Sequence, residues 1–272
     1  MVQSGFQLQN QANHGMIGEL KAAFPALENW PEEVIEEHLI ELLETLRHIK
    51  GTCGSVYDLH GVPVIHHVLI PEEKPGSFRK EVCQHSKKVV AKKLIELAGF
   101  PRRHLALTLE QLDAKEKVLA YIKSWPENKK TGRGLLIVGP TGVGKTQLVT
   151  ALGVEIVKRY VEAVNFVHLA DLCSIFRKAV KDAGTESRLE RLVRSRNLLI
   201  LDDVGAVPLS GFDHQSLNSL IDTRYREQLP TVFTANLSKG EMVGYIGERA
   251  VSRIKEMCWP VVLDGPDRRE GR

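Results

Sequence analysis

The pattern of hydrophobic and polar residues predicts alternating strands and helices over the second half of the chain. Short apolar runs of the kind found in buried strands recur at residues 134–138, 164–169, 197–201, 231–234 and 260–263. Helical segments separate these runs, and residues 147–161 carry helical periodicity directly after the first of them. Such alternation predicts a parallel sheet with helices on both faces, and such sheets bind ligands at the carboxyl ends of their strands.

The first half of the chain has a mainly helical pattern instead. A proline and two glutamates at residues 31–33 open a helix, and its apolar stripe consists of Ile35, Leu39, Leu42, Leu43 and Leu46. Further helices are expected over residues 87–97 and 108–125, the latter followed by a polar loop at residues 126–132. Residues 50–86 are irregular, and residues 1–15 are expected to be a disordered tail.

These patterns predict a small, mainly helical domain over residues 1–100 and an α/β domain over residues 101–272. The charge changes sign at the same place, with ten Lys/Arg against thirteen Asp/Glu before Pro101 and 27 against 21 from there on. The excess of basic residues in the second domain indicates either a nucleic-acid contact or an ordinary solvated surface. No apolar run approaches the roughly 18 residues that span a bilayer, and the start has no signal-peptide pattern, so we expect a cytoplasmic protein without membrane segments.

Residues 139–146 read Gly-Pro-Thr-Gly-Val-Gly-Lys-Thr, which fits the phosphate-binding loop pattern G-x-x-x-x-G-K-[ST] between a strand and a helix. Glycines let backbone N–H groups approach phosphate oxygens closely. We expect Lys145 to bind the β- and γ-phosphates and the Thr146 hydroxyl to ligate Mg²⁺. The residues predicted to contact the nucleotide are Gly139, Pro140, Thr141, Gly142, Val143, Gly144, Lys145, Thr146 and Gln147.

Two carboxylates, Asp202 and Asp203, follow the apolar run at residues 197–201. The carboxyl end of this strand should lie beside the phosphate loop. We therefore expect Asp202 to hold Mg²⁺ through its water shell and Asp203 to polarise the attacking water as a general base. Asn236 ends the next strand, where an amide can orient the water or sense the γ-phosphate.

Two arginines, Arg249 and Arg253, lie four residues apart on one predicted helix face. An arginine supplied across a subunit interface stabilises the charge of the transition state, which makes either residue a candidate arginine finger. A solvated basic face is the alternative.

The irregular segment at residues 50–86 contains two cysteines and several histidines. One interpretation is a degenerate zinc site with the ligands Cys53, His67, Cys83 and His85. The other is buried cysteines beside ordinary loop histidines, because the segment has no C-x₂-C pair.

Residues from about 100 to 269 resemble the AAA+ ATPase domain of bacterial replicative helicase loaders of the DnaC/DnaI type. The shared segments are G-P-T-G-V-G-K-T, L-I-L-D-D-V-G, T-A-N-L and G-E-R-A-V-S-R-I, with L-D-G-P-D-R-R after the last strand. The resemblance implies a P-loop NTPase core without the full helical lid. It assigns ATP and Mg²⁺ to Lys145 and Thr146, Walker B to Asp202 and Asp203, sensor 1 to Asn236, the arginine finger to Arg253 and sensor 2 to Arg268.

The resemblance further implies an ATPase that loads a hexameric replicative helicase onto single-stranded DNA and shares ATP between its own subunits. One alternative is an IstB-type transposition helper, which has the same core but serves a transposase on duplex DNA. Another is a nucleotide switch with negligible turnover, since many relatives have Glu at the position of Asp203. The long N-terminal region favours the loader, and we expect residues 16–100 to form an adaptor that grips the helicase.

A set of basic residues lies between the second and third predicted strands, namely Arg177, Lys178, Lys181, Arg188, Arg191 and Arg194. We expect phosphates of single-stranded DNA to meet this set, with Phe176 offering a ring for base stacking. An exposed charged face without a ligand is the alternative.

Overall fold

The structure is a computed structural model that describes residues 15–51, 64–112 and 115–267. The predicted disordered tail lies almost entirely outside these ranges. The chain divides into two compact units between Lys93 and Leu94, inside helix α4 (Gln84–Leu97), rather than at Pro101. The last residues before Pro101 belong to the second unit because they pack on it: Ala98 O accepts a hydrogen bond of 2.8 Å from Phe166 N.

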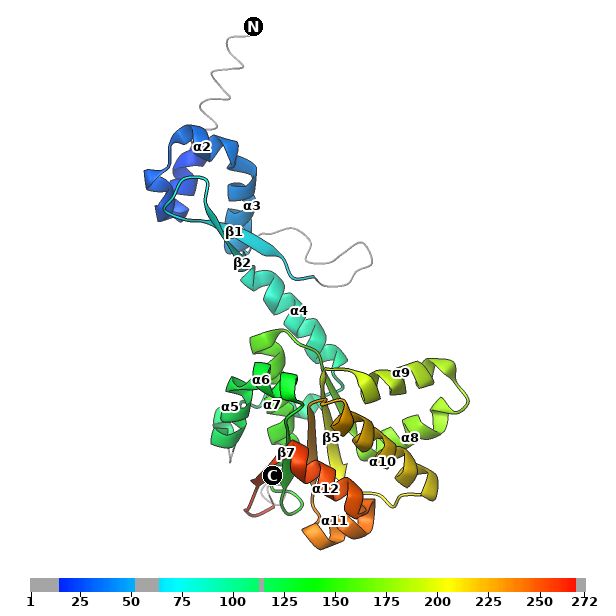
Figure 1. Cartoon of the computed structure of the whole chain (residues 1–272). Helices are drawn as coiled ribbons and strands as arrows, with labels where there is room; N and C mark the ends of the chain where they lie inside the picture. Colours follow the sequence, from blue (N-terminus) through cyan, green and yellow to red (C-terminus); the bar gives the residue numbers. More distant parts are fainter. Residues whose placement is uncertain (1–14, 52–63, 113–114, 268–272) are drawn as a thin grey trace. The chain divides into compact units, whose positions relative to one another are not determined.

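The first unit combines helices with a β-hairpin. Residues 15–23 are helical, and they are followed by η1 (Pro25–Asn29), α2 (Glu32–Glu37), α3 (Leu39–Ile49) and the antiparallel strands β1 (His67–Pro71) and β2 (Phe78–Val82) (Figure 1). The helix predicted from residue 31 is interrupted at His38, whose φ of −107° and ψ of 18° end α2. Its apolar stripe still packs inward, since Ile35 and Leu42 are fully buried beside Trp30. The hairpin was not predicted.

The second unit is built on a parallel sheet. Among the described residues this sheet has five strands in the order β4-β5-β6-β3-β7. The strands are β3 (Gly134–Val138), β4 (Val164–His168), β5 (Leu198–Val204), β6 (Thr231–Ala235) and β7 (Cys258–Val262). They fall on the five predicted apolar runs, so the predicted fold class is confirmed.

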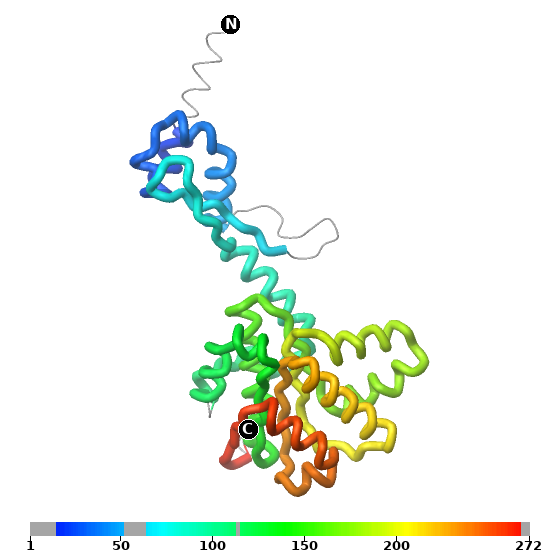
Figure 2. The backbone as a smooth tube through the Cα atoms, in the orientation of Figure 1, coloured from blue at the N-terminus to red at the C-terminus, as the bar shows by residue number. Residues whose placement is uncertain are grey.

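Helices cover both faces of the sheet, and the alternation of side chains along β5 shows how. Ile200 points toward α7 (Lys145–Tyr160), where its side chain approaches Gly153. Leu199 and Leu201 point the other way, into a core shared with five helices. These are α8 (Leu169–Ala179), α9 (Ala183–Arg194), α10 (Gly211–Arg226), α11 (Lys239–Ile246) and α12 (Glu248–Met257). Figure 2 shows α8 and α9 side by side next to α10.

The segment before β3 differs from its prediction. It contains η2 (Arg102–His104), η3 (Leu109–Gln111), α5 (Lys115–Lys123) and α6 (Trp125–Thr131). The polar loop expected at residues 126–132 is helical because Pro126 occupies the first turn, which suits proline, and the buried Trp125 anchors it. Gly132, with φ of 70°, ends the helix. No helix among the described residues is long and apolar enough to cross a membrane.

Candidate nucleotide-binding site

The phosphate loop connects β3 to α7 through two glycines with left-handed backbone conformations. Gly142 has φ of 80° and Gly144 has φ of 103°, a region that favours glycine. Helix α7 begins at Lys145, which is only 6% exposed. Its Nζ donates hydrogen bonds of 2.8 Å to Gly139 O and of 2.8 Å to Pro140 O. The loop therefore wraps around its own lysine, with the ammonium held at the start of the helix.

Asp202 lies at the carboxyl end of β5 and is completely buried. Its Oδ2 accepts a hydrogen bond of 2.9 Å from Thr146 Oγ1, and its Oδ1 accepts one of 2.6 Å from Thr234 Oγ1. His168 Nδ1 lies 3.1 Å from Asp202 Oδ2. The hydrogen bond with Asp202 raises the pKa of His168 above its ordinary value. Asp202 thus joins the phosphate loop to three neighbouring strands of the sheet.

Asp203 follows with a left-handed backbone, at φ of 59°. The pairing of β5 with β6 shifts register between Leu201 and Val204, so Asp203 lies in an irregularity of the strand. Its N–H donates to Thr234 Oγ1 at 2.8 Å, which fixes this conformation. In a regular strand, consecutive side chains point to opposite faces of the sheet. The irregularity lets the side chains of Asp202 and Asp203 lie together at the carboxyl end of β5 instead.

A cavity of about 440 Å³ opens in front of the loop. It is lined by Thr141, Gly142, Gly144, Lys145, Thr146, Gln147, Asp203 and Asn236 from the predicted set, and by Arg103, His104 and Ala206 in addition. The sequence reasoning missed Arg103 and His104. These two residues lie in a short segment some 40 residues before the phosphate loop. No spacing rule connects the segment with the loop, because folding alone brings them together.

The oxygen atoms around Asp202 suit a magnesium ion. The Thr146 hydroxyl and the Asp202 carboxylate are adjacent, and Mg²⁺ takes oxygen ligands of this kind together with water and phosphates. Within the described residues, His168, Asp202 and Asp203 also form a group of three metal-ligating side chains, whose ligand atoms lie within 4.8 Å of one another. Thr146 and Asp202 would hold Mg²⁺ where the phosphates of a bound nucleotide end.

The candidate arginine finger lies outside this cavity. Arg253, on α12, forms an ion pair with Asp222 of α10, and its guanidinium lies 5.7 Å from the centre of the Tyr225 ring. Its side chain is 16% exposed, whereas that of Arg249 is 78% exposed. Neither arginine lines the nucleotide cavity of its own chain. Arg268, the predicted sensor 2, lies outside the described residues.

The proposed zinc site is not supported. Cys53 lies outside the described residues, and His67 is exposed on β1. The thiol of Cys83 lies 3.1 Å from His48 Nδ1 instead, and His85 does not join the two in a metal-binding group of described residues. The zinc ligands were predicted from the irregular segment at residues 50–86. His48 precedes that segment and was therefore not considered.

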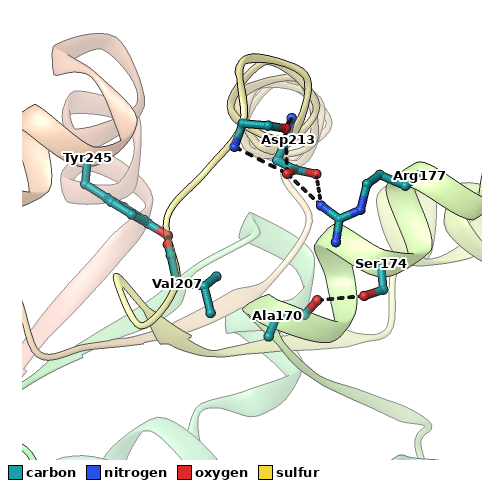
Figure 3. A network of polar contacts seen from close by, with 7 residues as sticks. Ala170, Ser174, Arg177, Val207, Asp213 and Tyr245 are labelled. Carbon is teal, nitrogen blue, oxygen red and sulfur yellow. Dashed lines mark hydrogen bonds and ion pairs between the residues drawn. The ribbon is translucent and has the colours of Figure 1, made fainter.

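Two members of the predicted DNA-binding set, Arg177 and Arg194, form ion pairs within the chain. Figure 3 shows Arg177 reaching Asp213, with hydrogen bonds of 2.9 and 2.7 Å to its two carboxylate oxygens. Arg194 Nη1 bonds to Glu227 Oε1 at 2.7 Å. The stacking role predicted for Phe176 is wrong, because this ring is only 3% exposed. The exposed members that remain are Lys178, Lys181, Arg188 and Arg191.

Comparisons with known proteins agree with this arrangement. Residues 81–254 match the family described as IstB-like ATP binding protein. The replicative helicase loader DnaI of Bacillus subtilis is 27% identical over 186 residues, which cover 61% of this chain and 59% of DnaI. The ATP-binding protein of insertion sequence IS232 from Bacillus thuringiensis subsp. berliner is 34% identical over 150 residues, which cover 53% of this chain and 58% of the relative. The chain thus spans less than two thirds of the length of either relative.

A crystal structure of the DnaC helicase loader has the same fold, with a TM-score of 0.56 and 24% identity over 60% of this chain and 99% of that chain. The family match contains the phosphate loop, the pair Asp202 and Asp203, and Asn236. It also covers well over half of the chain. The chain therefore belongs to the family of IstB-like ATP-binding proteins and has the AAA+ P-loop fold.

Proposed function

We propose that this chain is an ATPase that loads a hexameric replicative helicase onto single-stranded DNA. The observation that carries the proposal is a single cavity in which Lys145, Thr146, Asp203 and Asn236 meet. The names of the DnaI and DnaC relatives support the loading role. A further observation favours a loader over a bare ATPase core, because residues before Leu94 form a compact unit of their own.

Each of these cavity residues has its own role in ATP hydrolysis, in which the γ-phosphoryl group is transferred to water. On nucleotide binding, Lys145 exchanges the carbonyls of Gly139 and Pro140 for the β- and γ-phosphates. Bound Mg²⁺ supplies charge neutralisation on the phosphate oxygens. Asp203 accepts a hydrogen bond from the attacking water and orients it, and Asn236 positions the same water or the γ-phosphate. The site is thereby sensitive to whether a γ-phosphate is present.

The first unit offers a surface for the helicase. Ile40 is 73% exposed and Ile49 is 56% exposed on α3, and Leu69 of β1 is 37% exposed. Large apolar side chains at the surface are common contact points in protein interfaces. Exposed glutamates lie near Ile40 on α2 and α3, namely Glu36, Glu37, Glu41 and Glu44, so the partner surface expected around Ile40 is apolar with basic neighbours.

Single-stranded DNA would contact α8 and α9. Arg188 and Arg191 lie one turn apart on α9, and Lys178 and Lys181 lie on and just after α8. These side chains are exposed, and phosphate contacts by such side chains release counterions.

The second candidate is a transposition helper that acts with a transposase on duplex DNA. It is favoured by the 34% identity to the ATP-binding protein of IS232. The third is a nucleotide switch with negligible turnover, which the short side chain of Asp203 permits.

One experiment separates the three candidates. ATP turnover is measured for the full chain alone, with single-stranded DNA and with duplex DNA of the same length. We expect turnover that depends on Mg²⁺ and responds to single-stranded DNA. A response confined to duplex DNA would support the transposition helper, and tight ATP binding without turnover in all three mixtures would support the switch.

A further inference from the structure

His168 is the last residue of β4 and pairs in register with Asp202 of β5. Its imidazole therefore lies at the carboxyl edge of the sheet, where a nucleotide-bound cation is expected. The functions assigned to Lys145, Thr146, Asp202 and Asp203 leave this imidazole without a role. Its ring also lies 5.1 Å from that of Phe166, at an interplanar angle of 85°, so aromatic packing helps to fix its orientation.

The spacing of the ligand atoms fits one metal ion. His168 Nδ1 and Asp202 Oδ2 are 3.1 Å apart. Two neighbouring ligands of an octahedral ion with bonds of roughly 2.1 Å lie about 3.0 Å apart, which matches this separation. The Asp203 carboxylate completes the group within 4.8 Å. A cation placed between these atoms would meet one nitrogen and two carboxylates from β4 and β5.

We propose that His168 is a nitrogen ligand of the divalent cation in this site and makes the site favour Mn²⁺ over Mg²⁺. The inference rests on the cation site of the proposed ATPase and adds a ligand to it. Mg²⁺ takes oxygen ligands. Imidazole nitrogen suits first-row transition metals, and Mn²⁺ is the member of that series that also suits carboxylate and water ligands, so it fits a site with both kinds of ligand. An all-oxygen site would have a smaller preference.

The competing explanation is that His168 only donates a hydrogen bond to Asp202 and orients it. Both roles are compatible with the observed contact in the absence of the ion. They differ in what a substitution does to metal preference. A positioning role affects Mg²⁺ and Mn²⁺ alike, whereas loss of a nitrogen ligand weakens Mn²⁺ selectively.

The test uses the full chain and Mn²⁺, both alone and with saturating ADP. Bound Mn²⁺ is counted by electron paramagnetic resonance, Mg²⁺ affinity follows from competition, and the electron spin echo of the bound Mn²⁺ reports coupling to nitrogen. The variants are His168→Ala and His168→Asn, the second of which keeps a hydrogen-bond donor near Asp202. His214→Ala is the matched control, because His214 is an exposed histidine on α10 outside the cavity.

In the unmodified chain and in His214→Ala we expect nitrogen coupling on bound Mn²⁺ in at least one of the two states. Both His168 variants should lose it, and their Mn²⁺ affinity should fall about tenfold or more while Mg²⁺ affinity changes much less. Three results would overturn the proposal. These are failure of the unmodified chain to bind Mn²⁺ in either state, bound Mn²⁺ without nitrogen coupling, and a ratio of Mn²⁺ to Mg²⁺ affinity that His168→Asn and His168→Ala leave unchanged.

The same samples keep this inference separate from the proposed function. ATP and ADP binding with Mg²⁺ is measured by calorimetry on each protein. If the chain binds no nucleotide, the proposed ATPase fails, while Mn²⁺ bound to the protein alone still decides the role of His168. If nucleotide binds and the metal preference does not depend on His168, only the inference fails.

Discussion

Thr234 supports both acidic residues of the site with a single hydroxyl. This hydroxyl donates to Asp202 Oδ1 at 2.6 Å and accepts from Asp203 N at 2.8 Å. Thr234→Val keeps the shape and removes both bonds, so the two carboxylates lose their fixed positions. We expect ATP turnover to fall at least tenfold while ATP binding changes little, and the free energy of unfolding to drop by about 1–3 kcal/mol. Thr131→Val, an exposed change on α6, is the control.

Turnover kinetics and a thermal melt check this expectation. A Thr234→Val protein with the turnover of the unmodified chain would show that Asp202 and Asp203 hold their places without the hydroxyl.

The general-base role proposed for Asp203 predicts that ATP binding and ATP hydrolysis can be separated by one substitution. Asp203→Asn keeps the size of the side chain but removes the charge that draws a proton from the attacking water. We expect ATP affinity to stay within about threefold and turnover to fall at least a hundredfold, in the range of a lost general base. Binding by fluorescent nucleotide and turnover by phosphate release are measured on one preparation. Unchanged turnover would mean that the base lies elsewhere.

At the scale of elements, one buried arginine ties three segments together. Arg224 of α10 is 1% exposed. Its guanidinium donates to Thr231 Oγ1 at 2.8 Å, to Leu192 O at the end of α9 at 2.7 Å, and to Pro230 O before β6 at 2.9 Å. The carbonyls at the end of α9 carry the negative pole of the helix dipole, which offsets the buried positive charge.

Removing this guanidinium leaves several buried carbonyls without donors. We expect Arg224→Met to lower the free energy of unfolding by roughly 3–5 kcal/mol, as for breaking a buried charged network, and to reduce the melting temperature accordingly. The control is Arg226→Met, which removes an exposed guanidinium from the half-buried Asp222, a carboxylate that keeps its ion pair with Arg253, and should cost less than about 1 kcal/mol. Equal melting temperatures for the two variants would contradict this account of α9.

The elements that the sequence predicted well are those with a strong local signal. The buried strands and α7 follow from apolar runs, and the phosphate loop follows from fixed spacing within one segment. The hairpin β1–β2 was missed because β2 has no fully buried position, and its charged centre at residues 79–81 resembles a loop. The contributions of Arg103, His168 and Thr234 depend on which strands and segments become neighbours. Tertiary packing decides which strands and segments become neighbours, and it leaves no spacing pattern that a single sequence would reveal.

At the scale of the whole molecule, the positions of the arginines on α12 bear on assembly. Arg253 pairs with Asp222 and does not line the nucleotide cavity of its own chain. If it acts on ATP bound by a neighbouring subunit, it must exchange Asp222 for a phosphate. Mixing Arg253→Ala protein with Lys145→Ala protein then restores some interfaces in which neither defect is present.

We expect each variant alone to have little turnover and the equimolar mixture to recover a measurable part of it. Repeating the mixing experiment with Arg249→Ala in place of Arg253→Ala shows whether the more exposed arginine acts on the ATP of the neighbouring subunit. If ATP turnover does not recover at any mixing ratio, the arginine acts on the nucleotide of its own chain, or the protein uses no arginine finger.

The chain has two compact units, and we propose that the first binds the helicase while the second binds the nucleotide. The direct measurement is the transfer of the replicative helicase of the source organism to circular single-stranded DNA, followed by counting DNA-bound hexamers. We predict transfer with the unmodified chain and ATP, and with Lys158→Ala, an exposed lysine at the far end of α7. Lys145→Ala should capture the helicase but fail to transfer it, because losing the charged phosphate contact weakens ATP binding by roughly 2–3 kcal/mol. Equal transfer with and without ATP, or no capture of the helicase by the unmodified chain, would contradict the account.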